Sequence, residues 1–317
     1  MVKLDDGIML KMVAAKKFGE PTNPVNSIDY SDDGTTLIAA FNDDSVGIFD
    51  LKTGTRDKAQ VNSKKYGVGL VRYTHNTQSV IHSSTKVDHQ LRYLSLYDNK
   101  YLRYFAGHHG PVTALSMSPI DDMFLSASVD KTIRLWDLRT QSCQGLMQVS
   151  GRPVTAFDPE GLIFAAGINS EVVKLYDLRS FDKGPFSNFK IEREGSAAEW
   201  TSMVFAPDGK TIMLCTNGEY IRLLDSFDGN VKATLRGHRN DQRVELEAGF
   251  TPDSQYVVCG STNGQVVVWS AERGHEITRL QADQQIVKFT KWNPKYAMMA
   301  TAEATIHFWL PPEEIMN

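Results

Sequence analysis

Short runs of apolar residues, broken by polar positions and turn residues, fill almost the whole chain. The runs Thr132–Leu138 and Gln265–Trp269 show the type, with β-branched, aromatic and aliphatic side chains in close succession. No segment has the spacing of a long amphipathic helix. Near the N-terminus, Val25–Tyr30 is the first run expected to form an inner strand. The pattern predicts an all-β protein built from many short strands.

A three-residue motif recurs seven times, with two apolar or aromatic residues before Asp or its replacement. Its middle residues are 39 to 48 positions apart, a period typical of propeller blades. Turns that contain Pro, from Ser118-Pro119 to Asn293-Pro294, follow a similar period. The seven copies are Ile48–Asp50, Leu96–Asp98, Leu135–Asp137, Leu175–Asp177, Leu223–Asp225, Val268–Ser270 and Phe308–Leu310.

Seven repeats predict a seven-bladed β-propeller of four-stranded sheets, in one domain over residues 1–317. The short tail 311–317 begins with Pro311-Pro312 and cannot supply the last blade's outermost strand. The segment 10–18, Leu10 to Phe18, has the length to take that place. We therefore expect the ring to be closed by this N-terminal strand pairing in the last blade.

Composition and charge argue against several classes of protein. The chain has 34 Lys+Arg against 38 Asp+Glu, which does not fit a generally basic nucleic-acid binder. Its cysteines, Cys143, Cys215 and Cys259, lie too far apart for a metal knuckle or a dense disulfide framework. The longest apolar stretch, Leu162–Ile168, is much shorter than a membrane-spanning helix. We expect an intracellular protein that contacts neither a membrane nor nucleic acid directly.

Motifs of known enzyme classes are missing from the sequence. It has no Gly-x-Ser-x-Gly elbow, no phosphate loop, no dinucleotide-binding glycine motif and no His-Glu-x-x-His. His108 and Asp130 could be an acid–base pair, but a structural role is favoured. A hydrolase with paired carboxylates in the central channel is a further alternative, although no spacing points to it. We expect no catalytic site, no cofactor and no bound metal.

The stretch Gly107-His108, followed by Phe124–Asp137, closely resembles the WD-repeat (WD40) family. In that family such residues form a buried hydrogen-bond chain, from the indole donor through a hydroxyl and an imidazole to a carboxylate. A satisfied polar network of this kind fixes the geometry of a blade. The residues that the resemblance assigns to it are His108, Ser126, Asp130 and Trp136 in one blade and, in weaker form, His238, Asn263 and Trp269 in another.

Longer blocks resemble one subfamily, the WD-repeat subunit of the Set-one/COMPASS histone H3 lysine 4 methyltransferase complex. The same family also occurs in an RNA-processing assembly with protein phosphatase 1. The resemblance runs from about Phe18 to Pro311 and departs at the N-terminus, at Ile191–Glu199 and at Asp283–Gln285. The blocks are Ser63–Val68, Leu91–Tyr101, Cys143–Met147, Phe157–Gly167 and Lys174–Phe186.

This resemblance implies a non-catalytic nuclear adaptor, although the sequence has no basic import cluster. The adaptor would link the methyltransferase to transcribing RNA polymerase II through the phosphorylated C-terminal tail of the polymerase. Cations should then gather in the loops near His108 and Asp130, because Lys and Arg bind phosphate strongly. Lys64 and Lys65 beside Tyr66 are favoured, with a solvated surface as the alternative. The candidate residues are Lys64, Lys65, Tyr66, Lys86, His109, Arg152, Arg236, Arg239 and Arg243.

Two other interpretations concern partner binding. Many WD propellers present an Asp-x-Arg pair to cullin-type ubiquitin ligases, and this chain has Asp137 with Arg139 and Asp177 with Arg179. The same residues also suit a structural role at a strand end. The insert Phe181–Trp200 is the longest link between repeats, and either a docked partner segment or a solvated excursion would account for it.

Overall fold

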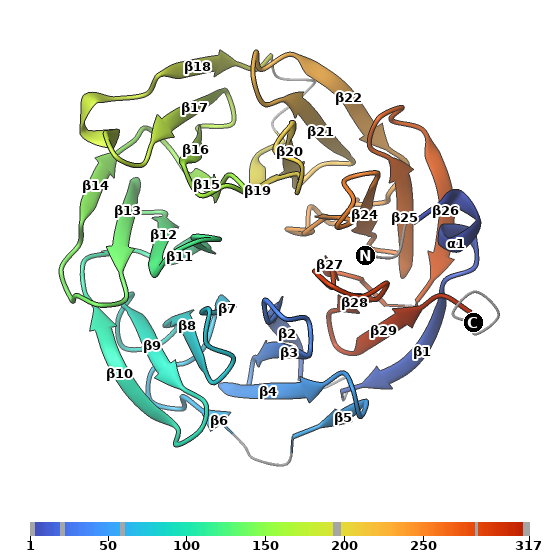
Figure 1. Ribbon diagram of the computed structural model, residues 1–317, viewed down its shortest axis with the longest axis horizontal. Coiled ribbons are helices and arrows are strands. Elements are labelled where there is room, and N and C mark those ends of the chain that lie inside the picture. The colour runs from blue at the N-terminus through green and yellow to red at the C-terminus, as the bar shows by residue number, and fades with distance from the viewer. Residues whose placement is uncertain (1–3, 20–22, 58–60, 193–197, 283–284, 313–317) are drawn as a thin grey trace. The chain divides into compact units, whose positions relative to one another are not determined.

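The computed structural model describes residues 4–19, 23–57, 61–192, 198–282 and 285–312. The chain divides into two compact units, one of Asn26–Ser196 and one of Met1–Val25 with Ala197–Asn317. Nearly all regular structure is strand, in seven antiparallel sheets (Figure 1), which confirms the predicted seven-bladed β-propeller class. No helix in these described ranges is long and apolar enough to cross a membrane. That residues 1–317 form one domain stays a prediction.

The unit Asn26–Ser196 contains four sheets, each formed by strands that follow one another in the chain. In the first sheet the short strand β6 also pairs with β4, next to β5. The strands are β2 (Val25–Tyr30), β3 (Thr36–Phe41), β4 (Ser45–Asp50), β5 (Thr55–Arg56), β6 (Val61–Asn62), β7 (Val71–Tyr73), β8 (Ser79–Ser83), β9 (Leu91–Ser95), β10 (Lys100–Phe105), β11 (Val112–Met117), β12 (Met123–Ser128), β13 (Thr132–Asp137), β14 (Gly145–Gln148), β15 (Pro153–Phe157), β16 (Ile163–Ile168), β17 (Val172–Asp177) and β18 (Ser187–Lys190), with the 3₁₀ helix η1 (Phe181–Lys183).

The other unit contains three sheets and the helix α1. Its elements are α1 (Asp6–Leu10), β1 (Val13–Phe18), β19 (Trp200–Phe205), β20 (Thr211–Thr216), β21 (Tyr220–Asp225), β22 (Val231–Arg236), β23 (Gly249–Phe250), β24 (Tyr256–Gly260), β25 (Gln265–Ser270), β26 (Glu276–Gln281), β27 (Phe289–Trp292), β28 (Met299–Ala302) and β29 (Ile306–Leu310). Residues 193–197 of the insert Phe181–Trp200 lie outside the described part of the chain. Residues 283–284 and 313–317 also lie outside it.

Aspartates set the tight turn between the first and second strands of several blades. Asp121 Oδ1 accepts the Met123 N–H at 3.1 Å, and Asp208 Oδ1 accepts the Lys210 N–H at 3.0 Å. Such an aspartate supplies a local acceptor that holds the chain in a turn. The Pro- and Asp-containing turns of the sequence therefore predict the strand ends, because the Asp side chains hold the turns with hydrogen bonds.

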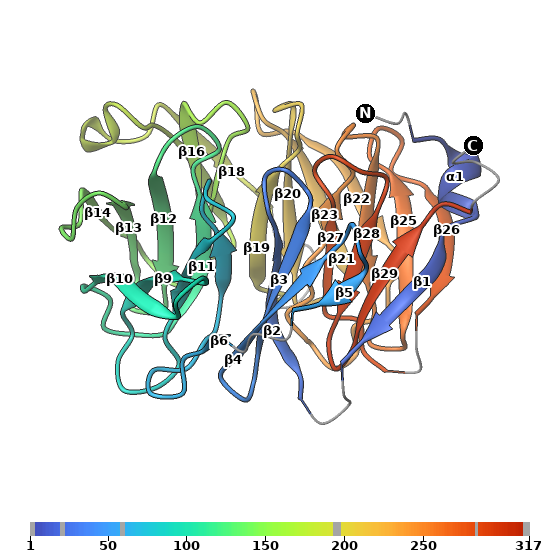
Figure 2. The same ribbon diagram turned by 60° about the horizontal axis from the view of Figure 1, so that its bottom comes forward.

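The N-terminal segment closes the last blade, as predicted. β1 pairs antiparallel with β29, with Val13 opposite Leu310 and Phe18 opposite Ile306. The strand is shorter than the expected 10–18, because Leu10 ends helix α1 and the strand begins at Val13. Figures 1 and 2 show α1 beside β26, on which it packs.

One repeat motif was misplaced by three residues. Leu96–Asp98 follows β9, and the side chain of Tyr97 is 87% exposed. The strand register instead puts Leu94 opposite Val80, the place that Trp136 takes opposite Phe124 in another blade. The Leu-Tyr-Asp triplet has the residue types of the repeat motif but lies in the turn after β9. The sequence pattern alone therefore assigns the motif to the wrong residues.

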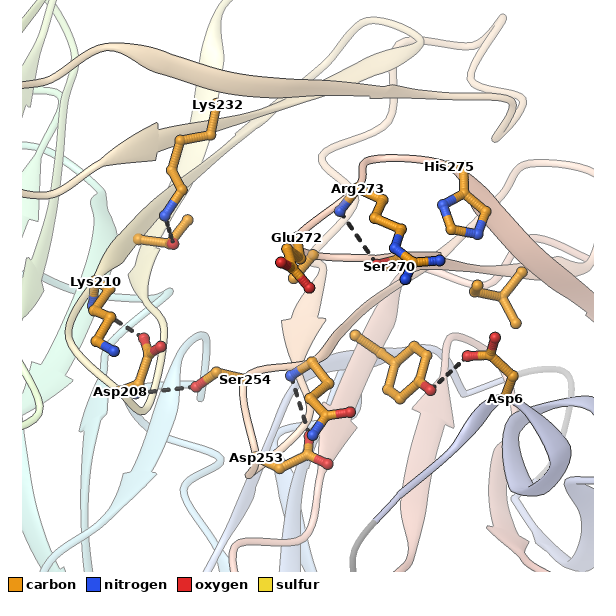
Figure 3. A pocket seen from close by; sticks show the side chains of 15 residues that line it. Asp6, Asp208, Lys210, Lys232, Asp253, Ser254, Ser270, Glu272, Arg273 and His275 are labelled. Atoms are coloured by element: carbon orange, nitrogen blue, oxygen red, sulfur yellow. Dashed lines mark hydrogen bonds between the residues drawn. The ribbon is translucent and has the colours of Figure 1, made fainter.

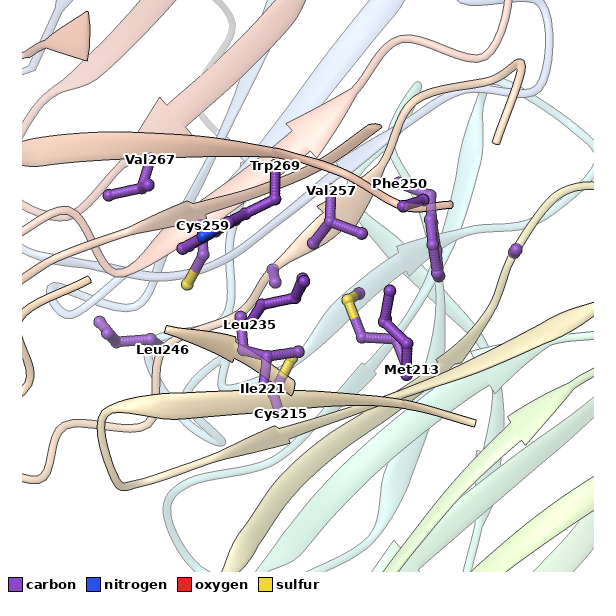
Figure 4. Close-up of a cluster of buried hydrophobic side chains, with 14 residues drawn as sticks. Met213, Cys215, Ile221, Leu235, Leu246, Phe250, Val257, Cys259, Val267 and Trp269 are labelled. Atoms are coloured by element: carbon purple, nitrogen blue, oxygen red, sulfur yellow. The ribbon is translucent and has the colours of Figure 1, made fainter. Parts of the chain in front are cut away.

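Apolar side chains from two neighbouring blades form a core between β19–β22 and β23–β26 (Figure 4). Met213, Cys215 and Ile221 come from one blade, and Cys259 and Trp269 from the other. All five are almost fully buried. Burial raises the pKa of both thiols, so these cysteines act as small apolar side chains.

In the unit Asn26–Ser196, His75 joins the turns of three consecutive blades. Its Nδ1 lies 2.6 Å from Asp32 Oδ2 and its Nε2 lies 3.0 Å from the Asp121 carbonyl oxygen. Since both partners are acceptors, both ring nitrogens must carry protons. Burial opposes this charge, but Asp32 and the carbonyl raise the pKa of His75 above its usual value.

Candidate partner-binding surface

The blade β11–β14 contains a continuous chain of buried side-chain hydrogen bonds. Trp136 Nε1 donates to Ser126 Oγ at 2.8 Å, and Ser126 Oγ lies 2.7 Å from His108 Nε2. His108 Nδ1 is 3.0 Å from Asp130 Oδ2, and Asp130 Oδ1 accepts the Thr132 N–H at 2.9 Å. The four side chains named from the sequence thus lie in one network. His108 precedes β11, Ser126 lies in β12, Asp130 in the β12–β13 turn and Trp136 in β13.

The electrostatics of this network suit a structural role. Burial lowers the pKa of His108, so the imidazole is neutral, with its Nδ1 proton directed at Asp130. Burial opposes ionisation of Asp130, but hydrogen bonds from Thr132, the His109 N–H and His108 lower its pKa. Both groups are committed to protein partners, which fixes the turn.

The corresponding network of the sixth blade does not form. Trp269 Nε1 donates to the Arg236 carbonyl oxygen at 2.8 Å instead of to a hydroxyl. Asn263 pairs with Gln265, and His238 Nδ1 is buried without a hydrogen-bond partner among the described residues. The register explains the difference, because Cys259 stands where Ser126 stands in the complete network, and a thiol is a poor relay. Burial lowers the pKa of His238 to about 4.

The last blade has a relay that the sequence interpretation missed. Trp309 Nε1 donates to Thr301 Oγ1 at 2.9 Å. Met299 lies opposite Trp309, so Thr301 occupies the same register position as Ser126. The sequence signal for this relay is a Ser or Thr eight to ten residues before the Trp, as Thr301 stands before Trp309 and Ser126 before Trp136.

A cluster of aromatic and basic side chains lies at the edge of the blade β7–β10, and we call it the Tyr66 cluster. The Arg92 guanidinium lies 3.5 Å from the ring centroid of Tyr66, and the Lys65 Nζ lies 4.9 Å from it. The Tyr66 and Tyr101 rings meet edge to face at 5.6 Å, and Tyr104 packs edge to face on Tyr66 at 6.4 Å. The cluster therefore presents half-buried aromatic surface beside cationic groups.

Arg92 is the buried support of this cluster. Its side chain is 2% exposed and makes two hydrogen bonds to Asp88, at 2.9 and 2.7 Å. The register places Arg92 opposite His82, as Arg134 lies opposite Ser126 in the complete network. Asp88 accepts the Gln90 N–H at 3.0 Å, as Asp130 does for Thr132. This blade replaces the Trp relay with a buried Arg–Asp pair.

The loop 84–90 is held against the loop of Tyr66 from several sides. The Thr85 and Lys86 N–H groups donate to the Tyr66 carbonyl oxygen at 3.0 and 2.8 Å. Lys86 forms an ion pair with Asp44. Between these anchors Val87 is 77% exposed at φ 69°, a left-handed conformation that is strained for a β-branched residue. Lys86 is thus engaged, while Val87 is held out into solvent.

The structure brings together only some of the predicted phosphate-binding residues. Lys64, Lys65, Tyr66 and Lys86 share the Tyr66 cluster and its adjoining loops. His109 and Arg152 belong to other loops of the same unit, and no described contact joins them to Tyr66. In the other unit, Arg236 lies over the Tyr220 ring at 5.5 Å and Arg239 pairs with Asp241 at 2.7 Å, while the Arg243 side chain is exposed.

The chain matches the family model of the WD domain, G-beta repeat, at residues 14–50, 99–137 and 229–270. It is 51% identical to WD repeat-containing protein 82 of Drosophila melanogaster over 314 residues, 99% of this chain and 98% of the relative. The chain belongs to this WD40-repeat family. COMPASS component SWD2 of Saccharomyces cerevisiae is 31% identical over 98% of this chain and 99% of its own length. Set1 complex component swd2 of Schizosaccharomyces pombe is 36% identical over 77% of this chain and 70% of its own.

The Asp-x-Arg pairs of this WD40 protein differ from one another. Arg139 donates from Nη2 to Asp137 Oδ2 at 2.6 Å and from Nε to Oδ1 at 2.9 Å, while its side chain stays 71% exposed. The Asp177 carboxylate accepts only the Arg179 backbone N–H, at 2.8 Å, among the described hydrogen bonds. Asp137 therefore holds an exposed guanidinium in place. This arrangement is consistent with ligase docking and equally with a structural role at the strand end.

Proposed function

We propose that this WD40 protein is a non-catalytic scaffold subunit of a Set1-type histone H3 lysine 4 methyltransferase complex in the nucleus. The observation that carries the proposal is its similarity to relatives named as components of the Set1 complex and of COMPASS. The propeller fold supports a scaffold role, since its loops offer peptide-binding surface while the blades stay rigid. In the network around His108 and Asp130, both side chains are engaged in hydrogen bonds within the protein.

We further propose that the protein links this complex to the phosphorylated C-terminal tail of RNA polymerase II through the Tyr66 cluster. Lys64 and Lys65 are exposed, and neither has an acidic partner among the described residues. A hydrogen bond with Tyr66 raises the pKa of Lys65, so its ammonium stays charged. The Lys65 ammonium over the Tyr66 ring and the exposed Lys64 next to it in the loop suit a phosphoserine followed by an apolar residue.

A binding assay with a charge-reversal variant tests this site. A fluorescent heptad-repeat peptide, with and without phosphoserine, is titrated with the wild-type protein and with Lys64→Glu/Lys65→Glu. We expect the phosphopeptide affinity to fall at least about tenfold, because two attractive contacts become repulsive. The matched control, Lys52→Glu/Lys183→Glu, changes the same charge at exposed positions elsewhere in the unit and should bind normally. Equal affinity of the site variant, at unchanged thermal stability, would remove the site.

Membership of the complex is tested separately, by affinity purification of the tagged protein from nuclear extract with mass spectrometry. Recovery of a SET-domain methyltransferase supports the scaffold role. Recovery of a protein phosphatase 1 regulatory subunit supports the second assembly that we propose for this family member. The exposed Arg139 is available for docking, which supports one alternative function, a substrate receptor of a cullin-type ligase. Recovery of only a ligase adaptor would favour that function.

A further inference from the structure

A groove of about 510 Å³ lies where turns of the blades β19–β22 and β23–β26 meet (Figure 3). The β19–β20 turn supplies Asp208 and Lys210, and the β23–β24 turn supplies Asp253 and Ser254. The β25–β26 turn and helix α1 complete its walls. We call it the turn groove. Its volume lies in the range of ligand sites, and none of its residues belongs to the Tyr66 cluster.

The walls of the turn groove are held in place by local hydrogen bonds. The Asp208 N–H donates to Ser254 Oγ at 3.0 Å, which joins the turns of the two blades. Asp253 Oδ1 accepts the Gln255 N–H at 3.1 Å. A site with fixed walls loses little conformational entropy when a ligand binds.

Most of the acidic groups in the groove already have donors from the protein. Asp6 Oδ1 accepts the Tyr256 hydroxyl at 2.6 Å, and Asp208 Oδ1 accepts the Lys210 N–H at 3.0 Å. Asp253 also receives the Thr251 hydroxyl at 2.7 Å. Two acceptors remain unmet among the described residues: the Glu272 carboxylate is exposed and has no partner, and Asp253 Oδ2 is buried without one.

The basic groups in the groove are mostly unengaged. The side chains of Lys210, Arg273 and His275 are exposed and have no hydrogen-bond or ion-pair partner among the described residues. Only Lys232 is engaged, at 3.1 Å from Thr211 Oγ1 and 3.8 Å from Asp225 Oδ2. In Figure 3, Lys210 and Lys232 lie to one side of Glu272, and Arg273 and His275 lie to the other. The groove therefore has unmet donors in two places, Lys210 on one side and Arg273 with His275 on the other.

An exposed aromatic side chain lies in a turn that is hydrogen-bonded to the β19–β20 turn of the groove. Phe227 is 90% exposed in the turn after β21. The Ser226 hydroxyl donates to the Gly209 carbonyl oxygen at 2.6 Å, which fixes this turn beside Lys210. A large apolar side chain on a fixed turn is a typical anchor in a protein interface.

We propose that the turn groove binds an acidic peptide segment of a partner protein. One anionic side chain of the peptide contacts Lys210, and a second contacts Arg273. A backbone N–H or a basic side chain between them faces Glu272, and an apolar residue packs on Phe227. This site goes beyond the proposed function and does not depend on the Tyr66 cluster.

The test begins with selection of a random dodecapeptide phage library on the full-length protein. We expect enrichment of peptides with two or more acidic residues and an aromatic or aliphatic residue. The enriched peptide is then synthesised with a fluorophore, and its affinity is measured by fluorescence anisotropy. We expect Lys210→Glu/Arg273→Glu to weaken its binding at least tenfold, because two attractive contacts become repulsive.

The controls keep a folding defect and the other site apart from this one. Lys11→Glu/Lys295→Glu makes the same charge change at exposed positions of the same unit and should bind the peptide normally. Lys64→Glu/Lys65→Glu should also bind it normally, so failure here and failure of the proposed function are distinct results. Enrichment of peptides without acidic residues would overturn the proposal. Undiminished binding by a folded Lys210→Glu/Arg273→Glu protein would overturn it as well.

Discussion

Helix α1 offers a sharp test of how the N-terminal segment stabilises the fold, because two adjacent residues face opposite environments. Met9 is fully buried, in a cluster with Val258, Val268 and Trp309, whereas Leu10 is 56% exposed. Replacing a buried Met by Ala costs about 2–5 kcal/mol, through lost burial and the cavity left behind. Leu10→Ala removes a similar volume from a solvated position and should stay within about 0.5 kcal/mol of the wild type.

The expected shift in melting temperature follows from the length of the chain. Unfolding entropy of about 2.1 cal/mol/K per residue gives roughly 0.7 kcal/mol/K for 317 residues. Met9→Ala should therefore lower the melting temperature by about 3–7 °C, and Leu10→Ala by less than about 1 °C. Thermal and urea unfolding followed by circular dichroism measure both. Equal shifts for the two variants would refute the assignment of α1 as a buried element.

The same reasoning extends to the whole segment. Leu4, Ile8, Met9 and Met12 are all buried, and burial of such side chains contributes about 1.5–3 kcal/mol each. Their sum, about 6–12 kcal/mol, is comparable to the total stability of about 5–15 kcal/mol of a typical domain. Deletion of residues 1–18 also removes the β1–β29 pairing. Such a truncation should not fold stably, and an unchanged melting temperature would contradict this.

Three further predictions follow from single sites. In urea unfolding, His75→Gln should destabilise the protein more at pH 5.5 than at pH 9. The pKa of His75 is raised in the folded protein, so protonation of this side chain stabilises the fold. That stabilisation is complete below the unfolded pKa of about 6.5 and is lost as the pH rises through the folded pKa. Ser126→Ala leaves the buried Trp136 indole N–H without its acceptor, which should cost about 1–3 kcal/mol by the same assay. Gly260→Ala would place a Cβ 2.1 Å from the Val287 carbonyl oxygen, so expression should yield an unstable protein with a clearly lowered melting temperature.

The fold could be predicted from the sequence because its signals are local. Strand runs, Asp and Pro turns and the recurring triplet depend on residues close in the chain, and Val25–Tyr30 matches β2 at both ends. The error at Leu96–Asp98 has a local cause too, since a turn there carries a triplet like that of the strands. Helix α1 was missed because it is short, and its apolar residues are buried by distant strands.

The site was predicted less completely because its contacts are not local. Trp136, Ser126 and Asp130 lie within one hairpin, so their spacing indicates the network. Tyr66 and Arg92 meet only after the loop of Tyr66 folds against strand β9, and a buried Arg leaves no pattern in a single sequence. The same limit hid the turn groove, whose charges come from turns of different blades.

Three of the buried indoles show how one requirement is met by different chemistry in different blades. Trp136 and Trp309 donate to hydroxyls of Ser126 and Thr301, whereas Trp269 donates to a backbone carbonyl. A side-chain acceptor can be lost by substitution, but a backbone acceptor cannot, so the sixth blade tolerates Cys259 at the relay position.

The blade β7–β10 departs further, since Leu94 replaces the indole and the Arg92–Asp88 pair takes over the polar interior. That pair also holds Tyr66 and the loop 84–90, so in this blade the group that fixes the fold directly supports the exposed candidate surface. Charge reversal at Lys64 and Lys65 probes binding without disturbing that support. Substitution of Arg92 would disturb both, because it would leave Asp88 without its charged partner.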